Sequence, residues 1–180
     1  MEIRRGRPVD APVITGFIRG MLEEIAELGG PAISTDTAPW AAPTRTIVQN
    51  LCQSDYGYFL AEDAAAHQGV VGLVAAQIAH WPAVFAPKRV LFLTAVYVVP
   101  TGRRQGIART LLHAALTWGH QAGCRDAMLY TSVHTPARRL YERLGFAGSE
   151  LKMVLPLSGE AEQAHREVSW GQRARHASHV

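Results

Sequence analysis

The sequence predicts an α/β fold arranged as one domain, on the basis of three observations. Its 180 residues are enough to bury one sizeable core, and 48% of them are hydrophobic, as in a globular chain. Stretches rich in β-branched and aromatic residues alternate with stretches whose apolar residues recur at helical spacing. One such transition, at residues 94–112, joins a strand to a helix through a basic turn that contains glycine.

The N-terminal region is expected to contain a strand followed by an amphipathic helix. Residues 1–5 have the pattern of a short strand. Asp10 is a residue type that caps helices, and Pro12 fits a first turn. An apolar stripe then extends to Leu28, and the glycines and proline at 29–31 end the helix.

The remaining elements follow from the same two periodicities and from the turn residues between them. Pro100 ends the strand before it, because proline has no N–H to donate to a ladder. Pro136 fits the first turn of a helix that Thr135 caps, and Gly145 is typical of its C-terminus. In chain order, the expected elements are a loop at 31–43, a helix from Thr44 to Leu51, a hairpin of strands 56–62 and 70–80, a loop at 81–87, a strand at 88–99, a helix at 105–122, a strand at 127–132, a helix around 137–144 and a strand at 149–157.

The turn after residue 100 has the properties of an anion-binding site. The first N–H groups of the helix that follows have no intrahelical partner and lie at the positive end of the helix dipole. Gly106 lets an anion approach the backbone, and Ala108 is nearly as small. Arg103 and Arg104 add charge that suits phosphate. No acidic residue between positions 91 and 125 cancels this charge, so the sequence predicts a cradle for a pyrophosphate.

Charge, cysteine content and hydropathy narrow the class of protein. A net charge of +3 favours anionic ligands in general but is too mild to indicate nucleic acid. Cys52 and Cys124 are far apart and have no metal-ligand spacing, which predicts a reduced chain without a metal site. The N-terminus lacks the apolar part of a secretory signal, and the most apolar run, at 69–79, is too short to span a bilayer. We therefore expect a cytoplasmic protein with no membrane partner.

Three segments have more than one interpretation. Glu23, Glu24 and Glu27 form either a solvated helix face or an acidic wall that attracts a cationic amine. The apolar loop at 81–87 either fills the core, covers a ligand or contacts a partner. Residues 158–180 form either a disordered tail or an extra helix that packs on the same chain or on a second copy, which leaves a homodimer open.

Two motifs in the expected order give the chain a family resemblance. Arg103-x-x-Gly106-x-Ala108, placed between a strand and a long helix, resembles the acetyl-CoA signature [QR]-x-x-G-x-[GA] of the GNAT acetyltransferase superfamily. Residues 136–146, P-A-R-R-L-Y-E-R-L-G-F, resemble the A-x-x-L-Y-x-x-x-G-F segment that these enzymes place after their fifth strand. The opening I-R-R-G-R-P-V-D-A also resembles the first strand and helix start of the family. The resemblance covers roughly residues 1–157, and the chain is identified as a member of this superfamily.

The resemblance implies a fold, a co-substrate and a set of site residues. The implied fold is a mixed, mostly antiparallel sheet of about six to seven strands, splayed in the middle and flanked by about four helices, over a domain of residues 1–157. The implied co-substrate is acetyl-CoA, with no metal. Tyr141 matches the family tyrosine that donates a proton to the leaving thiolate, and a packed helix tyrosine is the alternative. The residues that match the cofactor-binding pattern are Val98, Val99, Arg103, Arg104, Gln105, Gly106, Ile107 and Ala108, with His134 standing where many members carry a cofactor-contacting asparagine.

The implied activity is N-acetylation of a primary amine by direct attack in a ternary complex. The acidic residues of the first helix favour a small cationic amine as the acceptor. The alternative acceptor is a protein N-terminus or a lysine. The alternative function is that of a non-catalytic domain that binds acyl-CoA. His134 could alternatively assist proton transfer. Members of the family often carry a glutamate on the fourth strand as the general base, but this sequence has none there. The candidate bases elsewhere in the chain are Glu27, Asp36, Asp55, Glu62 and His80.

Overall fold

The computed structural model describes residues 1–29, 33, 36, 38–63, 69–82, 84, 89–132 and 135–150. The chain divides into two compact units, Met1–Phe146 and Ala147–Val180. Only residues 147–150 of the second unit are described, so most of the strand predicted at 149–157 and the whole tail at 158–180 lie outside the described residues. The domain boundary predicted at residue 157 stays a prediction.

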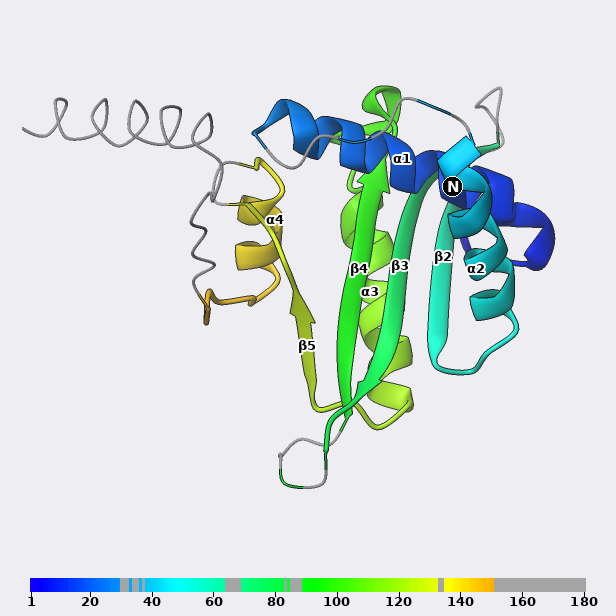
Figure 1. The fold of residues 1–180 in the computed structure, drawn as a ribbon. Helices are drawn as coiled ribbons and strands as arrows, with labels where there is room; N and C mark the ends of the chain where they lie inside the picture. Colours follow the sequence, from blue (N-terminus) through cyan, green and yellow to red (C-terminus); the bar gives the residue numbers. More distant parts are fainter. Residues whose placement is uncertain are drawn as a thin grey trace, which may run out of the picture. The chain divides into compact units, whose positions relative to one another are not determined.

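The first unit is built on a mixed sheet whose strands lie in chain order (Figure 1). The first three neighbouring pairs are antiparallel and the last pair is parallel, which confirms the predicted mixed, mostly antiparallel sheet. The described part of the chain contributes five strands, fewer than the six to seven predicted. They are β1 (Glu2–Arg5), β2 (Tyr56–Glu62), β3 (Val70–His80), β4 (Arg89–Val98) and β5 (Asp126–Leu129).

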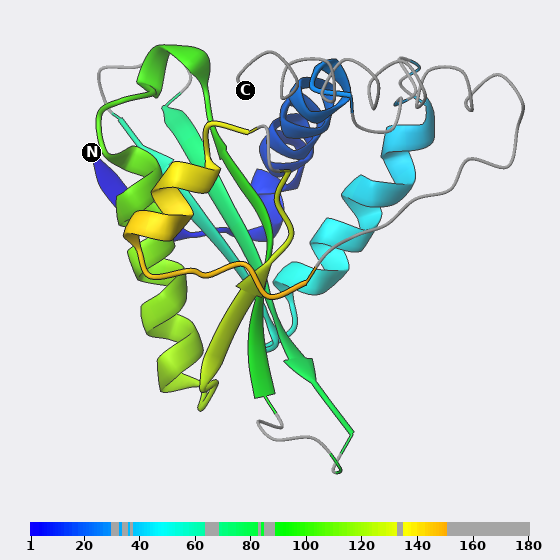
Figure 2. The ribbon, with the colours of Figure 1, turned by 90° about the vertical axis from the view of Figure 1, so that its left-hand side faces the viewer.

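Helices cover both faces of this sheet. Figure 2 shows the first two helices on one side and the third on the other. The described residues include four α-helices, as predicted: α1 (Ala11–Glu27), α2 (Ala41–Leu51), α3 (Ile107–Gln121) and α4 (Arg138–Arg143). Short 3-10 turns at Pro8–Asp10, Ala38–Trp40 and Pro100–Gly102 precede α1, α2 and the loop that leads to α3.

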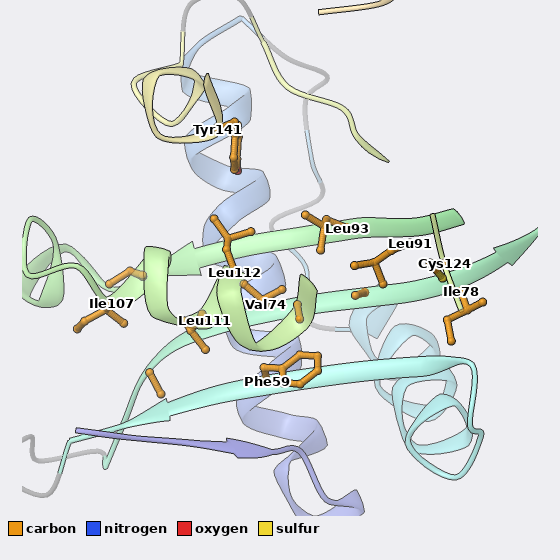
Figure 3. Packing of buried hydrophobic residues seen from close by; sticks show 14 of the residues in the cluster. Phe59, Val74, Ile78, Leu91, Leu93, Ile107, Leu111, Leu112, Cys124 and Tyr141 are labelled. Carbon is orange, nitrogen blue, oxygen red and sulfur yellow. The ribbon is translucent and has the colours of Figure 1, made fainter. Parts of the chain in front are cut away.

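Two separate hydrophobic cores result from the alternation of side chains along the strands. On the α3 face, Phe59 and Val74 pack with Leu111 and Leu112 of α3 (Figure 3). On the α1 and α2 face, neighbouring residues of the same strands, such as Leu60, pack with α1 and α2. Successive residues of one strand therefore pack in different cores. One core holds α3 on the sheet, and the other holds α1 and α2.

The helix α2 begins earlier than predicted. It starts at Ala41, so Pro43 lies inside its first turn, where a missing N–H costs nothing. Thr44 is not its cap: its hydroxyl donates to the carbonyl oxygen of Trp40 at 2.8 Å and lies 3.0 Å from the hydroxyl of Thr15 on α1. The prolines of this region indicated a loop, whereas one of them starts the helix.

The predicted cap of α1 has a different role. Asp10 makes no side-chain capping bond to α1. Its carboxylate accepts two bonds from the Arg4 guanidinium, at 2.7 and 2.9 Å, and one from the backbone N–H of Arg7, at 2.7 Å. These bonds lower the pKa of the buried Asp10 to about 2, with the Arg4 contact as the largest cause. Arg4 also donates to Glu62 at 2.6 Å, so this network fastens the start of α1 to β1 and β2.

The guanidinium of Arg5 fastens the edge strand β1 to α3. It lies 4.8 Å from the ring centre of Phe59 and 4.9 Å from that of Trp118, a cation–π arrangement between two aromatic rings. It also donates to the carbonyl oxygen of Tyr56 at 2.9 Å. Burial lowers the pKa of Arg5, but an arginine remains charged at neutral pH. A charged side chain thus holds β1 against the sheet and α3.

Candidate active site

The predicted anion cradle is a solvent-exposed loop between β4 and α3. Residues 103–106 are all exposed. Arg104 and Gly106 have positive φ angles of 66° and 81°, and α3 begins at Ile107, two residues later than predicted. Gly106 accepts the bond from Thr110 N–H at 3.1 Å, so the N–H groups of residues 107–109 start the helix without intrahelical partners. A side chain at Gly106 would meet nothing within 4 Å, which leaves its backbone open to a ligand.

One predicted phosphate ligand has a protein partner. The Arg103 guanidinium turns back from the loop and forms an ion pair with Glu24 of α1. Its Nε donates to the carbonyl oxygen of Val98 at 2.9 Å, and its central carbon lies 5.7 Å from the centre of the Tyr97 ring. The cradle is therefore tied to α1 through a contact between residues 79 positions apart.

The strand before the cradle opens away from β5. Ala75 pairs with Ala95 and Ala76 with Leu93, so Thr94 is one additional residue in β4, and its hydroxyl donates to the carbonyl oxygen of Ala75 at 3.2 Å. The pairing of β4 with β5 ends at Leu93, immediately before this bulge. The part of β4 that ends at Val98 keeps β3 as its partner on one edge only. This opening is the splay that the family resemblance implies.

Tyr141 lies on α4, against the core of the α3 face. Its side chain is 8% exposed and packs edge-to-face on Phe146, with ring centres 6.0 Å apart. In Figure 3 it projects from α4 toward the layer formed by α3 and β4. Burial raises the pKa of Tyr141 to about 12, so the phenol keeps its proton at neutral pH. Gly145, with a φ of 94°, follows α4 as the predicted C-terminal glycine, while His134 lies outside the described residues.

A cavity of about 570 Å³ lies on the other face of the sheet, beside the end of β4. The rings of Phe17 and Tyr97 meet there with their centres 5.8 Å apart. Burial raises the pKa of Tyr97, and the negative charge of Glu24 raises it further. The hydroxyl of Tyr97 lies against the α1 backbone, because a side-chain carbon built on Gly20 would come within 2.9 Å of it. The lining residues are Val13, Gly16 and Phe17 of α1, Val70 of β3, and Tyr97 and Val99 of the β4 end.

The candidate bases that the sequence offered lie in different environments. His80 and Asp55 form a pair with 3.1 Å between Nε2 and Oδ2. His80 pairs with Arg89, eight residues along β3 from the Gly72–Val98 pair, and it therefore lies roughly 25 Å from the Val98 end of β4. Asp55 is held beside His80, and Glu62 is bound by Arg4.

Sequence reasoning missed the side chains that line the cavity. In the sequence, Phe17 is one of many apolar residues in a helical stripe, and Tyr97 is one of several aromatic or β-branched residues of the strand at 88–99. Their meeting depends on the crossing of α1 over β3 and β4. The paired Gly16 and Gly20, four residues apart on α1, were the available signal, since small residues at helical spacing let another element approach closely.

Comparison with known protein families gives a match to one family model. The model of the acetyltransferase (GNAT) family matches residues 23–146. Among curated proteins, the aminoglycoside N(6')-acetyltransferase type 1 of Salmonella typhimurium is 36% identical over 62 residues, a match that covers 34% of this chain and 43% of that protein. The match therefore spans less than half the length of this curated relative.

Solved structures with the same fold are similar over most of their length. The structure of AAC(6')-Iy in complex with the bisubstrate analogue CoA-S-monomethyl-acetylneamine has a TM-score of 0.66 and 21% identity, over 87% of this chain and 97% of that one. A predicted acetyltransferase with acetyl-CoA from Clostridium acetobutylicum has a TM-score of 0.71 and 18% identity, over 87% and 96% of the two chains. These likenesses establish the arrangement of strands and helices.

In the described part of this chain, no helix is long and apolar enough to cross a membrane.

Proposed function

This chain belongs to the acetyltransferase (GNAT) family, and we propose that it transfers the acetyl group of acetyl-CoA to a primary amine of a small cationic molecule. The observation that carries the proposal is the exposed cradle at residues 103–106, directly between the opened end of β4 and the first turn of α3. A cationic amine is supported by the curated relative, which is an aminoglycoside acetyltransferase, and by the carboxylate of Glu24 next to the cavity.

The chain offers groups for each part of the co-substrate. The N–H groups of Ile107, Ala108 and Arg109 point out of the first helical turn and suit the pyrophosphate, with Arg103, Arg104, Gln105 and Gly106 supplying the rest of the loop. Beyond Leu93 the edge of β4 no longer pairs with β5 and can pair with an extended ligand instead. We therefore assign the pantetheine arm to the backbone of Val98 and Val99. His134 stays a proposed contact outside the described residues.

The reaction we propose is direct attack in a ternary complex. The neutral amine nitrogen attacks the thioester carbon, a carbon–nitrogen bond forms, and the carbon–sulfur bond breaks with its electron pair going to sulfur. A backbone N–H of the β4 opening would stabilise the negative charge that develops on the carbonyl oxygen. The amine must be neutral when it attacks, and one water molecule suffices to remove its proton.

Tyr141 is our candidate for the proton donor to the departing sulfur. A pKa of about 12 keeps the proton on the phenol throughout the neutral range, so the donor form is always present. A thiol with a pKa of about 8.5 is the stronger acid, so the transfer is uphill unless another proton replaces the one given. The amine loses a proton as it is acylated, and this proton can restore the phenol. Tyr141 would therefore pass a proton on without net consumption.

The decisive experiment compares cofactor binding in two matched glycine variants. Gly106 and Gly123 lie before and after α3, both have a φ of 81°, and a side chain at either would meet nothing within 4 Å. Gly106→Ala and Gly123→Ala should therefore lose similar stability, about 1 kcal/mol each. We expect calorimetry to show weaker acetyl-CoA binding in Gly106→Ala alone, because only Gly106 lies in the proposed cradle.

Turnover is tested by coenzyme A release with a panel of amines. Acetylation of aminoglycosides or polyamines supports the proposal, whereas acetylation of peptides alone would indicate a protein N-terminus or lysine as acceptor. Tight acetyl-CoA binding without acetylation of any amine would identify a non-catalytic binding domain. A wild-type protein that binds no acetyl-CoA would refute the proposal as a whole.

A further inference from the structure

The ion pair between Arg103 and Glu24 has no role in the reaction as proposed above. It links the cradle that we assign to the donor with the helix that lines the cavity on the opposite face. Tyr97 completes this cluster, since the centre of its ring lies 5.7 Å from the central carbon of the Arg103 guanidinium and the charges of both Glu24 and Arg103 act on its hydroxyl. The cluster is thus placed where donor and acceptor regions meet.

This ion pair is weak enough to be exchanged. Both side chains are 41% exposed, and pairs at that level of exposure shift an equilibrium by a factor of about five at most. A pyrophosphate carries more negative charge than one carboxylate and accepts paired hydrogen bonds from a guanidinium. A pyrophosphate bound next to Arg103 would therefore compete with Glu24 for the guanidinium.

Glu24 is the acidic residue of α1 that is coupled to the cavity. It stands seven residues, about two turns or roughly 10 Å, from Phe17 on the same side of the helix. Its charge acts on Tyr97, which lines the cavity. The neighbouring Glu23 pairs instead with Arg19 of its own helix at 2.9 Å. Of these two adjacent carboxylates, only Glu24 is connected to both sides of the site.

We propose that Glu24 selects a cationic amine as acceptor, and that Arg103 occupies its carboxylate until the phosphates of the donor draw the guanidinium away. This inference rests on the proposed function, because it needs the pyrophosphate in the cradle. Without the donor, Arg103 neutralises Glu24 and the amine finds no free anion. With the donor bound, Arg103 turns to the phosphates and Glu24 faces the ammonium group of the acceptor. The order of binding would thus follow from one exchange of partners.

One measurement distinguishes this exchange from a purely structural role of the ion pair: whether Glu24→Gln tightens or weakens coenzyme A binding. If Arg103 must leave Glu24 to bind phosphate, then Glu24→Gln removes a competitor and should tighten coenzyme A binding two- to fivefold in calorimetry. If the pair merely holds the loop in place, the same substitution should weaken coenzyme A binding. Glu23→Gln is the matched control, since it removes an equal charge from the next residue, and we expect it to change coenzyme A binding by less than twofold.

A second variant identifies Arg103 as the partner. Arg103→Gln should weaken coenzyme A binding. When Glu24→Gln is added to Arg103→Gln, coenzyme A binding should tighten by no more than Glu23→Gln tightens it in the wild type. Tightening that persists in the Arg103→Gln background would overturn the exchange, because it would then reflect general charge alone. Thermal unfolding of each variant shows that the protein is folded in the measurement.

The acceptor side is tested with kanamycin and spermidine, with and without coenzyme A, so that no turnover occurs. In the wild type, coenzyme A should strengthen the binding of at least one of these amines about fivefold or more. Arg103→Gln should bind the amine in the absence of coenzyme A as tightly as the wild type does in its presence, and Glu24→Gln should lose the enhancement. Amine binding that is indifferent to coenzyme A, or binding of neither amine, would overturn the inference.

Failure of this inference and failure of the proposed function give different results. A wild type that binds coenzyme A and acetylates amines, combined with a Glu24→Gln variant that binds coenzyme A more weakly, refutes the exchange and leaves the acetyltransferase intact. A wild type that binds no coenzyme A refutes both.

Discussion

The two faces of the sheet contribute to the candidate site in different ways. On the α3 face, the residues that we assign to the donor form one continuous stretch from Val98 to Ala108, next to a core in which Leu111 and Leu112 are fully buried. On the α1 face, the cavity is assembled from side chains of α1, β3 and β4 that are far apart in the sequence. One face provides backbone groups in a fixed local arrangement, and the other provides side chains that meet only in the folded chain.

This difference determines how strongly each face responds to amino-acid substitution. Backbone N–H groups at a helix start are present whatever the neighbouring side chains are, so the donor cradle tolerates many sequences that keep its small residues. The cavity changes with every substitution at Phe17, Tyr97 or Glu24. Apart from the Glu24–Arg103 pair, which connects the two faces, we expect substitutions on the α3 face to alter donor binding and chemistry, and substitutions on the α1 face to alter the choice of acceptor.

The largest expected effect is that of Tyr141→Phe on the α3 face. Loss of a positioned general acid typically lowers the rate by about 10²- to 10⁴-fold. The ring contact with Phe146 remains, so stability should hardly change. Steady-state coenzyme A release at saturating substrates measures the effect. Because the pKa of Tyr141 is about 12, the wild-type rate should show no alkaline loss from this group below about pH 11.

The matched control for this prediction is a buried tyrosine on the other face. Tyr58 is 6% exposed and belongs to the core under α1 and α2. Its hydroxyl oxygen accepts a hydrogen bond from the side-chain nitrogen of Asn50 at 3.4 Å. Tyr58→Phe should leave the rate of acetyl transfer unchanged. Equal activity of Tyr141→Phe and Tyr58→Phe would show that Tyr141 is only a packing residue.

The second prediction compares one fully buried leucine from each core. Leu111→Ala on α3 and Leu60→Ala on β2 should each lower the free energy of unfolding by about 2–5 kcal/mol, because each leaves a cavity. Leu111 supports the second turn of the helix that carries the cradle, so its loss should also weaken coenzyme A binding. Denaturant unfolding and calorimetry below the transition measure the two quantities. Equal weakening of coenzyme A binding in both variants would contradict the division between the faces.

The third prediction concerns the acidic network that fastens α1 to the sheet. The pKa of Asp10 lies at about 2 in the folded chain and near 3.8 in the unfolded chain, so its ionised form favours folding. The shift corresponds to about 2 kcal/mol, which is present above pH 4 and is lost as the pH falls toward 2. Asp10→Asn should therefore be less stable than the wild type by about 2 kcal/mol at pH 7, and denaturant titrations should converge near pH 2. A constant difference across this range would assign the effect to packing.

The smallest expected effects come from two glycines of α1. Gly16→Ala and Gly20→Ala should each gain up to about 1 kcal/mol of helix stability. A side-chain carbon at Gly16 meets nothing within 4 Å, whereas at Gly20 it lies 2.9 Å from the Tyr97 hydroxyl and must displace it. We expect Gly20→Ala to keep less of this gain in thermal unfolding than Gly16→Ala. Both should change KM for the amine, because Gly16 lines the cavity and Gly20 contacts Tyr97, and both should leave KM for acetyl-CoA unchanged. An unchanged amine KM in Gly20→Ala would show that Tyr97 does not shape the proposed acceptor cavity.

The loop that we assign to the donor was predictable because its signals are local. The end of β4 near Val98, the turn at Pro100 and the helix after Gly106 follow from residue types at adjacent positions. The helix start was misplaced by two residues because a positive φ at Arg104 has no sequence signature, unlike that at Gly106. The side-chain direction of Arg103 could not be predicted, because its partner Glu24 lies 79 residues away.

The cavity that we assign to the acceptor was less predictable, because its residues meet only in the folded chain. The stripe of α1 identifies Phe17 as buried but does not indicate which strand it contacts. The bulge at Thr94, which coincides with the departure of β5, depends on the register of two strands and leaves no pattern in the sequence. The prolines before α2 suggested a loop, although proline is also favoured in the first turn of a helix, where Pro43 lies.

The strand β1 is also an edge at which a second chain could pair. It forms one edge of the described sheet, and such an edge carries unpaired N–H and C=O groups on which another chain can add a strand. β1 is only four residues long, and Glu2, Arg4 and Arg5 make three of them charged. A short, charged edge opposes edge-to-edge aggregation. We therefore expect the arginines that fasten β1 to the rest of the fold also to oppose edge-to-edge association.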